Sequence, residues 1–188
     1  MFMFDAETLG TESTTVILSA AIVYFDENST YQTLLDDSCF VKLNAKDQIK
    51  RLGRTVTKDT LDWWSKQHSY VKGISFDPSS DDLLAEDSIE IIRGYINKFP
   101  NPKRQVIWAR GTLDQSSIDS LARKLNVECI MPFYMWRDVR TAVDVLYGSK
   151  NGYCEIVHPD FKKTDVIKHS PVHDCALDVM QLLYGKQI

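Results

Sequence analysis

The feature that most constrains the fold is a run of ten largely apolar residues, Val16–Phe25. Such a run, followed by the turn-forming residues Asp26–Ser29, predicts a buried strand and a reversal of the chain. Shorter apolar runs lie on either side, at Met1–Phe4 and Cys39–Leu43. The turn between the second and third runs favours antiparallel pairing. The chain is therefore expected to begin with a three-stranded antiparallel meander.

The rest of the chain alternates between helical and extended patterns. Helices are expected at Thr57–Gln67, Ser80–Phe99, Gln115–Leu125, Val139–Leu146 and Pro171–Tyr184, strands at Gln105–Ala109 and Val127–Met131, and a loop-rich segment at Tyr147–Thr164. Three strands, then helices, then alternating strands and helices predict a mixed α/β sheet covered by helices. This is the element order of a ribonuclease H-like fold.

Length and composition fit an ordinary globular protein. The 188 residues suit a single domain, 1–188, with one core. No apolar run approaches the length of a membrane-spanning helix, and the start of the chain turns acidic too early for a signal peptide. The four cysteines are scattered without a disulfide framework. A cytoplasmic location, in a bacterial cell or a phage-infected host, is therefore expected.

Two acids follow the first predicted strand, in the sequence Phe4-Asp5-Ala6-Glu7-Thr8. Side chains on a strand alternate between faces, so Asp5 and Glu7 point the same way. Two adjacent carboxylates raise each other's pKa unless a cation lies between them. The ordinary alternative is a pair of solvated acids at the end of a strand. If the pair is considered alone, this alternative is favoured over a metal site.

Asp114 follows a later predicted strand. The segment Trp108–Asp114 runs from an apolar strand through Gly111 into a helix. An acid in the first turn of a helix is common, because the helix dipole favours it. The functional alternative is a third metal-site carboxylate, delivered from the end of a neighbouring strand.

His173 and Asp178 form an H-x4-D pair on the last predicted helix. Residues five apart on an ideal helix are offset by about 140°, so these side chains do not share a face. That offset suits Asp178 as a ligand and His173 as a group that reaches the substrate from the loop edge. A helical acid and a surface histidine are the ordinary alternative.

Taken in order, these features resemble the DEDDh family of 3′–5′ exonucleases from the first strand to the last helix. Further stretches are similar to phage exonuclease A (DexA-type) proteins and related bacterial exoribonucleases. These stretches are F-D-A-E-T-L-G at 4–10, T-L-D-W-W-S-K-Q at 60–67, W-A-R-G-T-L-D at 108–114, W-R-D-V-R-T at 136–141 and H-D-C-A-L-D at 173–178. Each stretch is moderately specific, and five in register are a strong indication.

The resemblance implies a hydrolase that releases nucleoside 5′-monophosphates from the 3′ end of single-stranded DNA or RNA, with DNA favoured. The resemblance implies that Asp5 bridges two Mg²⁺ or Mn²⁺ ions. Glu7 and Asp178 are implied to complete the site of one ion, and Asp114 to bind the other. His173 is implied to deprotonate the attacking water. Hard cations need oxygen ligands, and a metal pair stabilises both oxygens of an in-line displacement. The four carboxylates together carry a charge of −4, which is the net charge of the whole chain. The net charge therefore neither supports nor excludes nucleic-acid binding.

Other residues are expected to hold the nucleotide. The resemblance implies that the backbone at Thr8 and Leu9 holds the terminal sugar, with Leu9 against the base. Trp63 and Trp64 point about 100° apart on a helix, so at most one can stack on a base while the other packs inside. Arg140 is expected to contact phosphate, with an internal salt bridge as the equal alternative.

Three alternatives stay open. Cys154, His158, His169 and His173 have the form C-x3-H…H-x3-H and allow a structural zinc site, although zinc ligands usually have closer cysteine pairs. A ribonuclease H-like module that binds nucleic acid without cleaving it is a second, and the intact acid set argues against it. A 3′–5′ exoribonuclease or oligoribonucleotide-trimming enzyme is the third, since the residues that read a 2′-hydroxyl are not identifiable here. A homodimer is compatible with the family resemblance.

Overall fold

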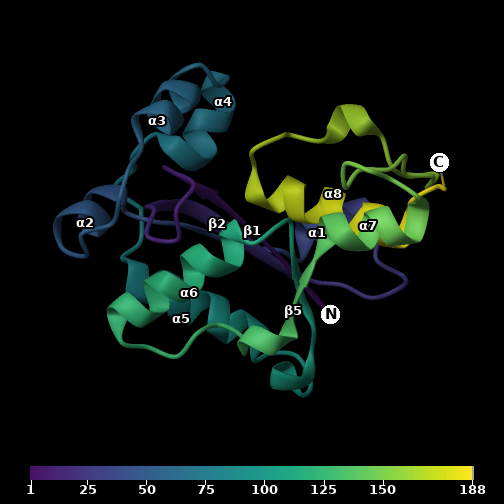
Figure 1. Cartoon of the computed structure of the whole chain (residues 1–188), viewed down its shortest axis with the longest axis horizontal. Coiled ribbons are helices and arrows are strands. Elements are labelled where there is room, and N and C mark those ends of the chain that lie inside the picture. Colours follow the sequence, from purple (N-terminus) through teal and green to yellow (C-terminus); the bar gives the residue numbers. More distant parts are fainter. Residues whose placement is uncertain (188) are drawn as a thin grey trace.

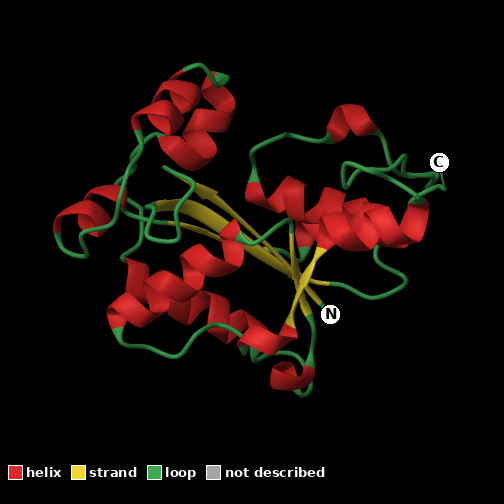
Figure 2. Cartoon of the chain, viewed as in Figure 1, coloured by secondary structure: helices red, strands yellow, loops and turns green. Residues whose placement is uncertain are grey.

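The computed structural model describes residues 1–187 and contains a five-stranded mixed sheet (Figures 1 and 2). The strands are β1 (Phe2–Thr8), β2 (Ile17–Tyr24), β3 (Cys39–Lys42), β4 (Ile107–Ala109) and β5 (Trp136–Asp138). Their order is β3-β2-β1-β4-β5, with β1 and β3 antiparallel to β2, and β4 parallel to both β1 and β5. The predicted meander and the mixed sheet of a ribonuclease H-like fold are confirmed.

Helices cover both faces of this sheet (Figure 1). They are α1 (Tyr31–Asp36), α2 (Ala45–Lys50), α3 (Lys58–Ser65), α4 (Ser69–Val71), α5 (Ala85–Ile96), α6 (Leu113–Leu125), α7 (Val139–Tyr147) and α8 (Pro171–Tyr184). A π turn lies at Lys72–Phe76, and 3₁₀ turns lie at Pro102–Arg104, Phe133–Met135 and Lys163–Asp165. Helices α5 and α6 pack on one face, and α1, α7 and α8 on the other. Among residues 1–187, no helix has both the length and the apolar character needed to cross a bilayer.

The alternation along β1 decides where the acids point. Phe2, Phe4 and Ala6 pack in the core beneath α5 and α6. Met3 packs instead with the core residues of α8 on the opposite face. Asp5 and Glu7 have the parity of Met3, so they face α8.

One predicted strand was wrong. Residues 127–131 form the exit from α6, because Asn126 adopts a left-handed backbone (φ 58°) and the Val127 N–H donates to the Ala122 carbonyl oxygen at 3.0 Å. Such a pattern ends a helix and satisfies its last carbonyls. The strand beside β4 lies a few residues later, at Trp136–Asp138.

One predicted helix begins too early. Helix α5 starts at Ala85, whereas the prediction placed its start at Ser80. Leu83 is extended beside β3: its N–H donates to the Lys42 carbonyl oxygen (2.9 Å), and its own carbonyl oxygen accepts from the Asn44 N–H (2.8 Å). Tertiary pairing therefore overrides the helical pattern in this segment.

Candidate active site

Carboxylates from three distant segments meet where β1, α6 and α8 come together. Burial raises the pKa of the Asp5 carboxyl well above its usual range, and the charges of Asp114, Asp174, Glu7 and Asp178 raise it further. Inside a protein, charges act on one another in this way only when they lie near each other. The structure therefore brings together the four acids that the sequence singled out, with Asp174 as a fifth.

Asp114 reaches this cluster through a turn that depends on Gly111. Gly111 has a φ of 83°, a conformation that favours glycine, and its N–H donates to Asp138 Oδ2 at 2.7 Å. The turn carries the chain from β4 into α6 and leaves Asp114 buried, 7% exposed. Burial raises the pKa of Asp114 well above its usual range, with Glu7 and Asp178 adding to the effect.

Asp178 is held by Arg110, which follows β4. Arg110 Nε donates to Asp178 Oδ1 (2.9 Å) and Oδ2 (3.1 Å), and Nη2 donates to Oδ1 (2.7 Å). Both side chains are largely buried, with 12% and 7% exposed. Burial raises the pKa of Asp178, and the Arg110 charge and hydrogen bonds oppose that rise.

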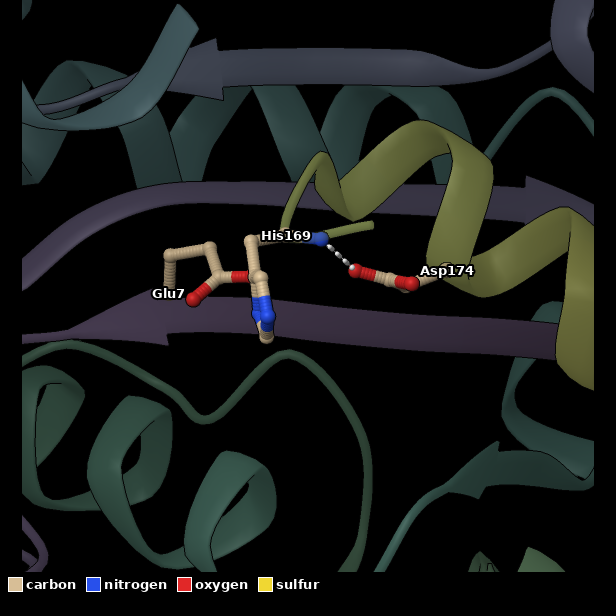
Figure 3. Close-up of side chains that lie close together, drawn as sticks. All are labelled: Glu7, His169 and Asp174. Carbon is tan, nitrogen blue, oxygen red and sulfur yellow. Dashed lines mark hydrogen bonds and ion pairs between the residues drawn. The ribbon is translucent and has the colours of Figure 1, made fainter. Parts of the chain in front are cut away.

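Glu7, His169 and Asp174 form a compact group of potential ligands (Figure 3). Each offers an atom, and these atoms lie within 4.8 Å of one another. His169 Nδ1 is 3.7 Å from Glu7 Oε1, and the backbone N–H of His169 donates to Asp174 Oδ2 at 2.8 Å. Glu7 raises the pKa of His169, and burial together with Glu7 raises that of Asp174 to about 7.

His173 lies on the first turn of α8, beside α1. Its Nδ1 is 2.7 Å from the Tyr31 hydroxyl, which also lies 3.4 Å from the Asp165 carbonyl oxygen. Burial lowers the pKa of His173. Nε2 is therefore the ring nitrogen that Tyr31 leaves unengaged.

The two tryptophans of α3 have different surroundings. Trp64 is fully buried, and its Nε1 donates to the Thr8 carbonyl oxygen at 3.0 Å. Trp63 is 39% exposed and meets the His169 ring edge-on, with centroids 4.7 Å apart. One tryptophan of the pair is therefore buried and the other, Trp63, is exposed.

Thr8, Leu9 and Arg140 lie around the same edge. The Thr8 hydroxyl donates to the Gly10 carbonyl oxygen (2.8 Å), and Leu9 is 5% exposed in the core cluster that contains Trp64. Arg140 is exposed on α7. Its charge lowers the pKa of both Asp114 and Asp178, so it lies beside the acid cluster.

The donor set fits hard divalent cations. Buried carboxylates that raise one another's pKa lose that repulsion when a cation lies among them, and Mg²⁺ and Mn²⁺ prefer such oxygen ligands. The structure supports a zinc site less well, because the three histidines of that alternative have separate partners. His158 contacts Tyr184, His169 contacts Glu7 and His173 contacts Tyr31. In the described part of the chain, Glu7, His169 and Asp174 are the one group of three His, Cys, Asp or Glu side chains whose ligand atoms lie within 4.8 Å of one another.

Sequence reasoning missed Arg110, Asp174 and His169 as members of this site. Asp174 precedes Asp178 by four residues, and side chains at that spacing share a helix face, so the helical period could have revealed it. Arg110 and His169 come from loops, at the end of β4 and just before α8. No periodic pattern predicts where such residues point.

Comparison with known proteins identifies the family of this chain. The model of the Rv2179c-like 3′–5′ exoribonuclease domain matches residues 1–182. The chain belongs to this family. It is also 26% identical over 204 residues to the exodeoxyribonuclease of Enterobacteria phage T4, an alignment that covers 98% of this chain and 88% of that protein. The predicted DEDDh resemblance and the prediction of a 3′–5′ exonuclease are thereby confirmed.

The acid cluster lies within the region that the family model matches. The matched region begins on β1 with Asp5 and Glu7 and ends within α8, beyond Asp178. Every carboxylate of the cluster therefore lies inside the exonuclease domain.

Proposed function

We propose that this exonuclease removes nucleoside 5′-monophosphates from the 3′ end of single-stranded DNA, with Asp5, Glu7, Asp114 and Asp178 holding two Mg²⁺ or Mn²⁺ ions. The observation that carries the proposal is the mutual rise in pKa among carboxylates on β1, α6 and α8. Bound there, a metal pair would supply charge stabilisation for the attacking and leaving oxygens.

His173 is the proposed general base. Its spacing from Asp178 matches the H-x4-D pattern of the family that the chain resembles. The Tyr31 hydroxyl has one proton to donate; when it donates to the Asp165 carbonyl oxygen, it accepts from His173 Nδ1–H. Nε2 then keeps its lone pair, which is the form that accepts a proton from water.

Trp63 and Arg140 are the proposed exposed contacts for the substrate strand. An exposed indole at the edge of the acid cluster offers a surface for base stacking, which is tolerant of sequence. The exposed Arg140 guanidinium carries the positive charge that a phosphate needs near five carboxylates. The backbone at Thr8 and Leu9, where β1 ends, is the proposed rest for the terminal sugar.

DNA is the proposed substrate because the relative aligned over nearly the whole chain is an exodeoxyribonuclease. RNA is the second candidate, since the family model describes an exoribonuclease domain. Both substrates present the same phosphodiester to the acid cluster, so the cluster itself does not discriminate between them. The distinction depends on contacts with the 2′ position of the sugar.

The test is digestion of matched 5′-labelled DNA and RNA oligomers with Mg²⁺ or Mn²⁺. The expected result is a ladder of shortened DNA, faster than for RNA, that disappears when the 3′ end is blocked and when Asp5→Ala replaces the wild type. Faster digestion of RNA would reassign the substrate. Cleavage that persists with a blocked 3′ end, or in Asp5→Ala, would overturn the proposed mechanism.

A further inference from the structure

Arg110 makes more contacts at the acid cluster than its place in a turn requires. Besides its three hydrogen bonds to Asp178, its Nη2 donates to Gln181 Oε1 (2.8 Å) and its Nη1 to the Gly152 carbonyl oxygen (2.7 Å). The guanidinium also lies over the Tyr153 ring, 4.3 Å from its centroid. Helix α8 and the loop at Gly152 and Tyr153 thus hold one planar cation against one carboxylate.

The hydrogen bonds divide unequally between the oxygens of Asp178. Oδ1 accepts from both Nε and Nη2, whereas Oδ2 accepts only the longer contact from Nε, at 3.1 Å. A carboxylate has about four acceptor positions, two on each oxygen. Oδ1 is thereby filled, and Oδ2 keeps a free position for another cation.

Arg110 also has the wrong surroundings for a residue that binds the substrate. Its side chain is only 12% exposed, and every nitrogen already donates to a protein acceptor. A phosphate contact would have to replace bonds that the fold supplies. Arg140, exposed on α7, has no such restriction.

We propose that Arg110 is a positioning residue, which fixes the Asp178 carboxylate in one orientation and leaves Oδ2 available to a divalent cation. The proposal rests on the proposed metal-dependent function. Groups that orient a metal ligand typically change metal affinity or activity 10- to 100-fold when removed. Arg110 also offsets part of the charge that five clustered carboxylates would otherwise carry without metal.

The test measures Mn²⁺ binding by calorimetry, without nucleic acid, in the wild type, Arg110→Ala, Arg110→Lys and Arg123→Ala. Arg123 is the matched control, because its side chain is 71% exposed and forms an ion pair with Asp119, away from the cluster. Mn²⁺ affinity is expected to fall about 10- to 100-fold in Arg110→Ala and to stay unchanged in Arg123→Ala. Arg110→Lys should give an intermediate loss, because an ammonium keeps the charge but not the planar fork.

Thermal unfolding in EDTA separates positioning from folding. Arg110→Lys is the variant expected to fold with near-normal stability, so its weaker Mn²⁺ binding carries the test if Arg110→Ala does not fold. Unchanged or tighter Mn²⁺ binding in a folded Arg110 variant would overturn the proposal. Tighter binding would mean that Arg110 competes with the cation for the Asp178 carboxylate. If Asp5→Ala and Asp178→Asn also left Mn²⁺ binding unchanged, the proposed metal site itself would fail, not the role of Arg110.

Discussion

Asp174 and Asp178 occupy successive turns on one face of α8, yet their surroundings differ. The Asp178 side chain is 7% exposed and accepts hydrogen bonds from the Arg110 guanidinium. Asp174 accepts a backbone hydrogen bond from the His169 N–H and has Glu7 as a nearby like charge. Burial raises the pKa of both, but an arginine opposes the rise only at Asp178.

The difference shows that helix position does not decide what an acid does. The same residue type, one turn apart, is held by an arginine in one place and has its pKa raised to about 7 in the other. Asp178 has an oxygen with a free acceptor position, whereas Asp174 already accepts the backbone N–H bond of His169, which can fix that segment in either protonation state. We therefore expect Asp178 to serve chemistry and Asp174 to hold the segment that carries His169.

The largest expected effect tests this division directly. Asp178→Asn should reduce turnover by several orders of magnitude, because an amide is a poor replacement for a charged ligand of a hard cation. Asp174→Asn should reduce it less than about tenfold, since an amide oxygen still accepts the His169 N–H bond. Single-turnover rates on a DNA oligomer with saturating Mn²⁺ give the comparison. Equal losses in the two variants would contradict the separate roles.

The second effect compares the histidines on either side of this turn. His173→Ala is expected to lower turnover about 10²- to 10⁴-fold, the usual contribution of a general base, while Mn²⁺ binding is retained. His169→Ala should cost much less, because His169 lies against Glu7 and Trp63 without the predicted spacing from Asp178. The reverse order of losses would assign the base to His169.

How much of the fold could be predicted from the sequence depends on how far apart along the chain the interacting residues lie. Helix α8 was predicted to its end residues, because a proline at the first position and an apolar face define it locally. The acid pair on β1 was predicted to share a face because a strand alternates with period two. The short helices α1 and α2 escaped prediction, since six residues hold too few periods to detect.

The site could be predicted only in part for the same reason. Asp5, Glu7, Asp114 and Asp178 follow a known order along the chain, so the resemblance located them without coordinates. Arg110 became part of the site only when β4, α8 and the loop at Gly152 came together. Contacts between loops and distant helices leave no local signal in a sequence.

The third effect concerns stability and pH in the presence of chelator. The pKa of Asp174 is about 7 in the folded protein against an ordinary 3.8, so its neutral form favours folding. That contribution is complete below pH 3.8 and is lost as the pH rises through about 7, on the order of 4 kcal/mol from the size of the shift. Asp174→Asn mimics the neutral form and should lose less stability than the wild type between pH 4 and 8. Parallel denaturation curves at every pH would contradict the assignment.

The smallest effect is expected for Tyr31, which is the hydrogen-bond partner of His173, as Arg110 is of Asp178. Tyr31→Phe removes the hydroxyl 2.7 Å from Nδ1 and with it the bond that favours a free lone pair on Nε2. One hydrogen bond is worth about 1 kcal/mol, so turnover is expected to fall up to about tenfold at constant KM. Because the substitution keeps the ring that packs against Phe161, the fold should be unaffected, which thermal unfolding checks. A Tyr31→Phe enzyme as fast as the wild type, with His173→Ala still severely impaired, would mean that His173 is oriented by α8 alone. A loss in Tyr31→Phe that is absent in the His173→Ala background would instead place the two residues in one unit, as the proposed tautomer requires.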